Sequence, residues 1–311
     1  MASADQLLND LPHEERIRSR KLAGGVATII ADASGLSESE SKAMEGELRA
    51  AALAMPDVNE ARVALTASQP HRRLIAVGSG KGGVGKSTVA ANLAIALARA
   101  GNKVGLIDAD VYGPSQPTIL GSDAKPTAED DRLIPVEAHG LRFLSLGQLV
   151  SPGHALAWRG PMATGALAKL VEADWGDCEL LLVDLPPGTG DVQLSLIQRS
   201  RPEGAVIVST PQDLSLIDAR RAVDLFNKTS VPVLGIIENM ATYACPHCGE
   251  ESHPFGTGGA ETAAAEMGVP FLGRLPLSLE LREASDSGHP LAAEAEAFTT
   301  IAAKLIEAVK H

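Results

Sequence analysis

The chain contains a glycine-rich segment at 80–88, GKGGVGKST, that sets narrow limits on how it can fold. This segment follows an apolar run at 74–79, LIAVGS, and opens a helix-like stretch at 87–101, STVAANLAIALARAG. The segment matches G-x-x-x-x-G-K-[ST], in which glycines let backbone N–H groups close around phosphates at a helix N-terminus. A strand, this loop and a helix in that order predict a phosphate-binding βα unit within a parallel sheet.

The polar side chains of this loop have predicted roles in holding a nucleotide. Lys86 would reach the β- and γ-phosphates, and the Ser87 hydroxyl would ligate Mg²⁺. Lys81 is an additional lysine, for which a generic phosphate-binding loop has no requirement. Further contacts with the nucleotide are expected from the remaining loop positions, Gly80, Gly82, Gly83, Val84, Gly85 and Thr88.

From residue 74 onward, short runs rich in Val, Ile and Leu alternate with helical stretches. Their lack of polar alternation is typical of parallel strands that are covered on both faces. We predict a doubly wound, mostly parallel α/β domain of the P-loop NTPase class over 71–311, with ligands at the carboxyl ends of its strands. The predicted strands after the first are KVGLID at 103–108, LRFLSL at 141–146, LLLVDL at 180–185, AVIVST at 205–210 and VLGIIEN at 233–239.

Residues 1–70 predict a separate, small α/β appendage. Its elements would be a strand in GGVATIIADASGL at 24–36, a helix at 37–55 and a strand in VNEARVALTA at 58–67, giving a β-α-β unit. Ser37 or Ser39 would cap the helix. A short basic linker, SQPHRR, would join this appendage to the larger domain.

Charge and hydropathy exclude several classes of protein. Lys and Arg total 27 against 39 Asp and Glu, a net charge of -12, which argues against coating nucleic acid or an anionic membrane. No run reaches the roughly 18 apolar residues that a membrane helix needs, and the N-terminus lacks a signal-peptide pattern. We therefore expect a cytoplasmic protein with no nucleic-acid or membrane partner.

Carboxylates follow two of the predicted strands. Asp108 ends one of them and Asp110 lies two residues on, so both would point to the same side if the extended geometry continued, although two aspartates there could equally form a turn. Asp184 ends LLLVD and precedes LPPGTGD, where Gly188 would let its backbone approach the γ-phosphate. With the glycine-rich loop, Asp184 predicts Mg-ATP binding.

A close pair of cysteines, Cys245 and Cys248, forms the motif C-P-H-C. Two thiolates are half of a tetrahedral site, and a twofold axis would supply the other two from a second chain. Cys178 is predicted to be a core or surface residue. The spacing leaves an iron–sulfur cluster and a zinc ion open; a thiol–disulfide pair is less favoured because 248–259 does not continue as a helix.

Several motifs together resemble the Mrp/ApbC iron–sulfur carriers, within the deviant P-loop family that includes the nitrogenase iron protein and the Min-type and ParA-type ATPases. The resemblance covers about 74–290. Its motifs, besides the glycine-rich loop and the cysteine pair, are DADVYGPSQP at 108–117, WRGPM at 158–162, DLPPGTGD at 184–191, STPQ at 209–212, ENM at 238–240 and FGTGGAE at 255–261.

The resemblance implies roles for individual residues. Lys81 would reach across a homodimer interface to the partner's nucleotide and stabilise charge there, as an arginine finger does. Asp110 would position the attacking water, while Asp108 would support the Mg²⁺ held by Ser87 and Asp184. Asn239 would contact the adenine, since an amide offers a donor and an acceptor together.

The function implied by the resemblance is that of a slow ATPase that carries a [4Fe–4S] cluster between two subunits and transfers it to apo iron–sulfur proteins. The appendage would be a degenerate form of an iron–sulfur assembly-type domain, and it contains no cysteine. The alternatives are a positioning ATPase of the Min or ParA type and a zinc-stapled ATPase regulator. The tail at 293–311 has mixed charge rather than the basic helix that membrane positioning would use.

Overall fold

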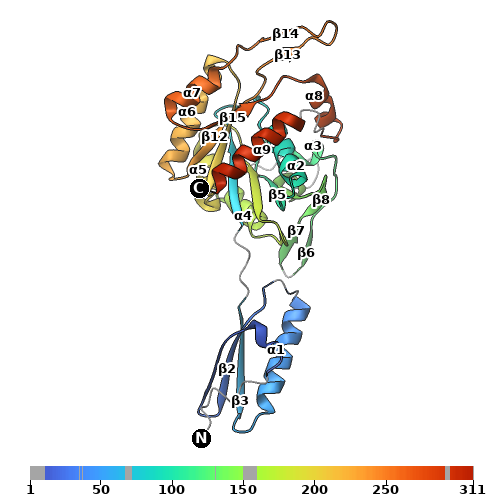
Figure 1. Cartoon of the computed structure of the whole chain (residues 1–311), viewed down its shortest axis with the longest axis vertical. Coiled ribbons are helices and arrows are strands. Elements are labelled where there is room, and N and C mark those ends of the chain that lie inside the picture. Colours follow the sequence, from blue (N-terminus) through green and yellow to red (C-terminus); the bar gives the residue numbers. More distant parts are fainter. Residues whose placement is uncertain are drawn as a thin grey trace. The chain divides into compact units, whose positions relative to one another are not determined.

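A computed structural model of the chain describes residues 11–34, 36, 38–66, 72–129, 131–149, 160–290 and 295–310. The chain divides into two units, Met1–His71 and Arg72–His311, drawn in Figure 1. Hydrophobic cores form separately within the two. Among the helices of these described ranges, none combines the length and the apolar character needed to cross a membrane.

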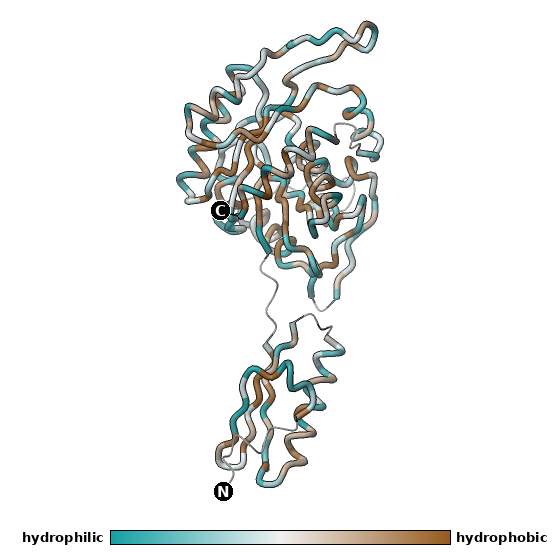
Figure 2. The backbone as a smooth tube through the Cα atoms, in the orientation of Figure 1, coloured by the Kyte–Doolittle hydropathy of each residue, from teal (hydrophilic) through white to brown (hydrophobic). Residues whose placement is uncertain are grey.

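The larger unit is built on an eight-stranded sheet with the order β15-β12-β11-β4-β10-β5-β9-β8. All neighbouring strands pair in parallel except β8 and β9, which are antiparallel. Figure 2 shows hydrophobic residues concentrated along these strands. The strands are β4 (Arg73–Gly78), β5 (Val104–Asp108), β8 (Val136–Ala138), β9 (Leu141–Ser145), β10 (Leu180–Asp184), β11 (Gly204–Ser209), β12 (Val233–Glu238) and β15 (Phe271–Arg274).

Helices cover both faces of this sheet, so the predicted doubly wound α/β class is confirmed. On one face, α2 (Lys86–Arg99) and α9 (Ala295–Val309) pack over one hydrophobic cluster, with α8 (Leu279–Asp286) beside them. The other face carries a second cluster. Its helices are α4 (Gly160–Val171), α5 (Asp191–Ser200), α6 (Asp213–Lys228) and α7 (Gly259–Met267).

The six strands expected from the apolar runs are all present, and several short strands were not predicted. β15 was missed because FLGR is four residues long and ends in arginine. The sheet also gains β8 at its edge, and two small hairpins lie outside it. These hairpins are β6 (Thr127–Glu129) with β7 (Arg132–Ile134), and β13 (Tyr243–Ala244) with β14 (Glu251–Ser252).

The smaller unit differs from the predicted β-α-β pattern by one strand. β1 (Ile17–Ala23) pairs antiparallel with β2 (Val26–Asp32), which pairs in parallel with β3 (Glu60–Thr66). The pattern IRSRKLA hid β1, because charged residues interrupt it and only one face of this strand meets the core. A short 3-10 turn, Glu14–Arg16, precedes it.

The helix of the smaller unit, α1 (Glu38–Leu53), packs on one face of this three-stranded sheet. Its start at Glu38 argues against Ser39 as the cap and leaves the alternative, Ser37, untested. Ser39 lies inside the helix rather than at its end, and Ser37 lies outside the described residues. The same is true of most of the predicted linker, of which only Arg72 and Arg73 are described.

Three central strands bring the predicted site residues together. β10 lies between β4 and β5, with Asp184 aligned with Val77 on one side and with Asp108 on the other. Because all three strands are parallel, their carboxyl ends meet at one edge of the sheet. The glycine-rich loop leaves β4 at that edge, where ligands of open α/β sheets bind.

Candidate functional site

The glycine-rich loop requires glycine at two of its positions. Gly85 has φ 79° and precedes α2, and a Cβ there would lie 2.3 Å from Nδ2 of Asn239. A Cβ on Gly80 would lie 2.0 Å from the carbonyl oxygen of Asp218 in α6. The positive φ of Gly85 strains any other residue, and at Gly80 a Cβ would collide with backbone, so the tight path of the loop depends on both glycines.

The loop borders a cavity of about 430 Å³. Its backbone from Gly82 to Thr88 forms one wall, and Asp110, Pro187 and the end of α8 at Ser285 and Asp286 contribute to the others. Backbone N–H groups at the start of α2, together with Lys86 and Ser87, are donors and ligands suited to a Mg²⁺-bound polyphosphate. The residues present therefore fit the predicted Mg-ATP.

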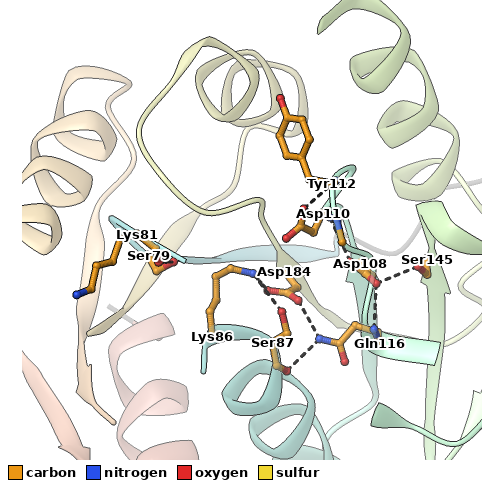
Figure 3. Close-up of polar contacts among 11 residues, drawn as sticks. Ser79, Lys81, Lys86, Ser87, Asp108, Asp110, Tyr112, Gln116, Ser145 and Asp184 are labelled. Atoms are coloured by element: carbon orange, nitrogen blue, oxygen red, sulfur yellow. Dashed lines mark hydrogen bonds and ion pairs between the residues drawn. The ribbon is translucent and has the colours of Figure 1, made fainter. Parts of the chain in front are cut away.

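Lys86 and Asp184 form an ion pair beneath this loop, shown in Figure 3. The lysine is 6% exposed and the aspartate is fully buried. Lys86 Nζ also lies 3.4 Å from the Ser87 hydroxyl. The amine that would contact phosphate is therefore already held at the phosphate site by the carboxylate predicted to hold Mg²⁺.

Gln116 is a site residue that the sequence reasoning missed. Its backbone N–H donates to Oδ2 of Asp108 at 3.0 Å, and its Nε2 donates to the Ser87 carbonyl at 3.0 Å and to Oδ2 of Asp184 at 2.9 Å (Figure 3). The side chain is fully buried at the start of α3 (Gln116–Ile119). Its only sequence signal was its place within DADVYGPSQP.

Asp108 lies at the end of β5 and is completely buried. It accepts hydrogen bonds from the Gln116 backbone and, at 2.9 Å, from the Ser145 hydroxyl, a second partner that sequence reasoning missed. Burial, and then the nearby charge of Asp184, raise the pKa of Asp108 to about 7. Two carboxylates this close favour a neighbouring cation, and carboxylate and hydroxyl oxygens are the ligands that Mg²⁺ prefers.

Asp110 does not continue the extended path of β5. Its Oδ1 accepts hydrogen bonds from the backbone of Tyr112 at 3.0 Å and of Gly113 at 3.3 Å, so it shapes a turn while lining the cavity. Asp108 instead faces Gln116 and Ser145 (Figure 3). The condition for both aspartates to point the same way, a continued extended strand, is not met because β5 ends at Asp108, and Asp110 instead fits the alternative of a turn-forming aspartate.

Lys81 and Gly188 flank the same loop. Figure 3 shows the Lys81 side chain directed away from Lys86 and Asp184, and within the described ranges its ammonium has no ion pair. The Gly188 N–H donates to the Ser79 carbonyl at 3.0 Å, with φ 100° at Gly188. Its N–H is therefore used on the loop backbone, and an approach of Gly188 to a γ-phosphate stays a prediction.

Asn239 follows β12 and is buried against the glycine-rich loop. Its Nδ2 donates to the Val84 carbonyl at 2.9 Å, and its backbone N–H donates to the Ser209 carbonyl at 2.7 Å. The side chain thus supports the loop itself. A contact between Asn239 and adenine stays a prediction.

The two cysteines of C-P-H-C lie on a projecting segment, residues 240–257, which we name the cysteine arm. Figure 1 shows its β13–β14 hairpin standing away from the sheet and helices. Cys245 is half-buried and Cys248 is exposed. Hydrogen bonds from the backbone of His247 and Cys248, and then from the Cys248 side chain, lower the pKa of Cys245. A lowered thiol pKa favours the thiolate that binds metals.

One chain contributes few metal ligands in this region. Across the described ranges, no group of three or more His, Cys, Asp and Glu side chains is placed to hold a metal ion. Cys178 is buried in the core of the larger unit, and burial raises the pKa of its thiol. Of the two positions expected for Cys178, core or surface, it takes the core one.

Residues 71–310 match the family described as ParA, the NUBPL iron-transfer P-loop NTPases. The chain belongs to this family. A Pseudomonas fragi protein called iron-sulfur cluster carrier protein is 50% identical over 225 residues, covering 71% of this chain and 78% of that protein. One of the same name from Deinococcus radiodurans is 44% identical over 318 residues, covering 96% of this chain and 90% of that protein.

Solved structures place the fold of this family member beside those of other nucleotide-binding proteins. A nucleotide-binding protein from Archaeoglobus fulgidus, in complex with ADP, superposes with a TM-score of 0.64 at 39% identity and covers 73% of this chain and 90% of its own. The cell division ATPase MinD of Pyrococcus furiosus gives a TM-score of 0.59 at 24% identity, covering 76% and 98% of the two chains. The likeness to MinD concerns the fold alone.

Proposed function

We propose that this chain carries an iron–sulfur cluster as cargo, delivers it to apo iron–sulfur proteins, and couples this to the binding and hydrolysis of Mg-ATP by a homodimer. One observation carries the proposal: two cysteines on a projecting arm, one half-buried and one exposed, occur on the same unit as a cavity lined by the glycine-rich loop. The carrier names of the Pseudomonas and Deinococcus relatives support the cargo.

The proposed binding of Mg-ATP is supported by the buried contacts beneath the glycine-rich loop. Mg²⁺ bound with ATP would supply charge neutralisation at the phosphates, held by Ser87 and Asp184. Lys86 would then turn from Asp184 toward the β- and γ-phosphates. Gln116 would keep Asp184 oriented during this exchange, since it also holds the Ser87 carbonyl.

Hydrolysis would need two residues that do not hold the ground-state nucleotide. Asp110 lines the cavity and is fixed in a turn, so its second carboxylate oxygen could orient a water molecule for attack. Lys81 points away from its own Lys86 and Asp184, which suits a lysine that serves the partner's phosphates. This arrangement would make turnover depend on dimer formation.

The proposal that the chain carries a cluster is supported by the number of cysteine ligands that two chains would offer. Each arm offers two thiolates, and a second copy of the chain would complete four around one [4Fe–4S] cluster. Zinc would use the same four sulfurs, and remains the alternative occupant.

For the smaller unit, we propose descent from an iron–sulfur assembly-type domain, supported by the Deinococcus relative, whose match extends over 96% of this chain.

The deciding experiment is metal analysis of the full chain purified without oxygen. A carrier should hold iron and sulfide, show an oxygen-sensitive absorbance, and pass its iron to an apo-acceptor enzyme that gains activity. Stoichiometric zinc with none of these properties would contradict the cluster and favour the zinc-stapled regulator.

A further inference from the structure

Both ends of the cysteine arm are held by one side chain. Glu238, the last residue of β12, directly precedes Asn239 and the arm, and Gly258 directly follows the arm. Oε1 of Glu238 accepts the Gly258 N–H at 3.2 Å, and its Oε2 accepts the Ala260 N–H at 2.7 Å. A single carboxylate thus closes the base of the arm.

This carboxylate is a fixed anchor. Glu238 is fully buried, and Nε of Arg274 donates to its Oε1 at 3.0 Å. Arg274 also forms an ion pair with Glu261, on the outer side of the guanidinium. Charge-assisted hydrogen bonds to a buried carboxylate are strong and directional, so a displacement of the end of β12 would displace Gly258 with it.

The next residue contacts the nucleotide loop. Asn239 donates to the Val84 carbonyl, and its Nδ2 would lie only 2.3 Å from a Cβ at Gly85. Val84 and Gly85 belong to the backbone predicted to close around the phosphates. Within two consecutive residues, Glu238 and Asn239, the chain therefore touches both the phosphate-binding loop and the base of the cysteine arm.

The first residues of the arm are connected to the backbone of Glu238 through the segment after β15. The Ala241 N–H donates to the Leu275 carbonyl at 3.0 Å, and the Leu277 N–H donates to the Thr242 carbonyl at 2.7 Å. Leu275 in turn donates to the Glu238 carbonyl at 2.8 Å. A change at the Glu238–Asn239 junction has a continuous path of hydrogen bonds to the residues just before Cys245.

We propose that Glu238 is a positioning residue that transmits nucleotide binding from the loop to the cysteine arm, so that occupancy of the phosphate site changes the order of the segment carrying Cys245 and Cys248. The inference rests on the proposed function for its purpose. Its physical content, a coupling between two segments, needs no cluster and is testable without iron.

The test is amide hydrogen exchange of the iron-free full chain, with and without Mg-ADP. In the wild type, Mg-ADP should slow exchange at 82–88 and also, by about threefold or more, at 241–253. In Glu238→Gln, an amide donor replaces one carboxylate oxygen and faces an N–H, so at least one contact is lost. Exchange at 82–88 should still respond to Mg-ADP, while the response at 241–253 should be clearly smaller than in the wild type, because the side-chain contacts of Glu238 are weakened and only the backbone contacts of Ala241 and Thr242 remain.

Glu261→Gln is the matched control. It removes a carboxylate from the same Arg274 but leaves the contacts of Glu238 with Gly258 and Ala260, so the arm should respond as in the wild type. Arg274→Gln is a second variant at a half-exposed site, which protects the test against misfolding of Glu238→Gln, and it should weaken the response of the arm.

Two outcomes would overturn the coupling: a wild-type arm that ignores Mg-ADP while 82–88 responds, or a Glu238→Gln arm that responds fully. Absence of any response at 82–88 would instead contradict nucleotide binding, and with it both the proposed function and the coupling. If the wild-type chain bound no iron but still showed the exchange response at 82–88 and 241–253, the result would contradict only the proposal that it carries a cluster.

Discussion

Lys86 and Asp184 are paired in the interior, with exposures of 6% and 0%, although each is also assigned to a different part of Mg-ATP. The pair balances a charge that would otherwise be buried alone beside Asp108. Under the proposed function, nucleotide binding would exchange these partners: Lys86 would contact phosphate, and Asp184 would help to hold Mg²⁺.

Lys86→Ala should abolish nucleotide binding and also destabilise the ligand-free protein. Removing one member of a buried ion pair leaves the other without compensation, which typically costs about 3–5 kcal/mol. Titration with a fluorescent ADP analogue and urea unfolding measure the two effects. Lys81→Ala is the control, and should keep both properties nearly unchanged. Equal loss of affinity in both variants would contradict the separate roles of the two lysines.

Lys81→Ala and Asp110→Asn should each bind Mg-ATP and each lose turnover, because their roles lie in the chemical step. If Lys81 acts across a dimer, mixing the two variants should restore activity. Half of randomly formed dimers would be mixed and hold one complete site of two, so about a quarter of wild-type phosphate release is expected. A mixture no more active than its components would argue that Lys81 serves its own subunit.

Gln116→Ala should weaken Mg²⁺ affinity in the presence of ADP by about 10- to 100-fold, the range typical for residues that orient a metal ligand. The reason is that Asp184 loses the donor that holds its Oδ2. Titration of Mg²⁺ at saturating ADP measures the change. Thr118→Ala, a change at a position of α3 that lines the cavity, should leave the Mg²⁺ requirement intact. An unaltered requirement in Gln116→Ala would remove this residue from the site.

Asp108 should make the metal-free, nucleotide-free protein less stable as pH rises. Its pKa is about 7 in the folded chain, against an ordinary value of 3.8. Between about pH 4 and pH 7 the folded state therefore binds more protons than the unfolded state, so the free energy of unfolding falls with increasing pH across this window. Asp108→Asn should flatten the dependence, as judged by urea midpoints at several pH values. Parallel pH profiles for the wild type and the variant would refute the assignment.

Cys245→Ala or Cys248→Ala should abolish iron retention after anaerobic reconstitution, whereas Cys178→Ala should retain it. The wild type should hold about one four-iron cluster per two chains, since each subunit gives two thiolates. Iron and sulfide assays with size measurement by light scattering test this. All three variants should still bind ADP, because the phosphate site uses no sulfur. A monomer that retains a full cluster would exclude the shared site.

The predictable part of this protein was local. A strand, a glycine-rich turn and a helix are specified by neighbouring residues, so the loop at 80–88 and the start of α2 could be read directly. Six of the eight sheet strands appeared as apolar runs, because strands covered on both faces exclude polar residues. The closeness of Cys245 and Cys248 was equally local, since only two residues separate them in the sequence.

Contacts between segments that are distant in the sequence became visible only in the folded chain. Gln116 became a site residue only because β5, β10 and the loop after β4 end at one edge of the sheet, and no spacing in the sequence reports such contacts. β1 and β15 were hidden, since a short or one-sided strand lacks a distinctive apolar run and is stabilised by its neighbours. In the sequence, Glu238 is a polar residue near the end of the predicted strand at 233–239. In the fold it is buried and accepts hydrogen bonds from Gly258, Ala260 and Arg274, which makes it the anchor of the cysteine arm. A buried carboxylate needs such donors, and these come from segments that follow it in the chain by 20 residues or more.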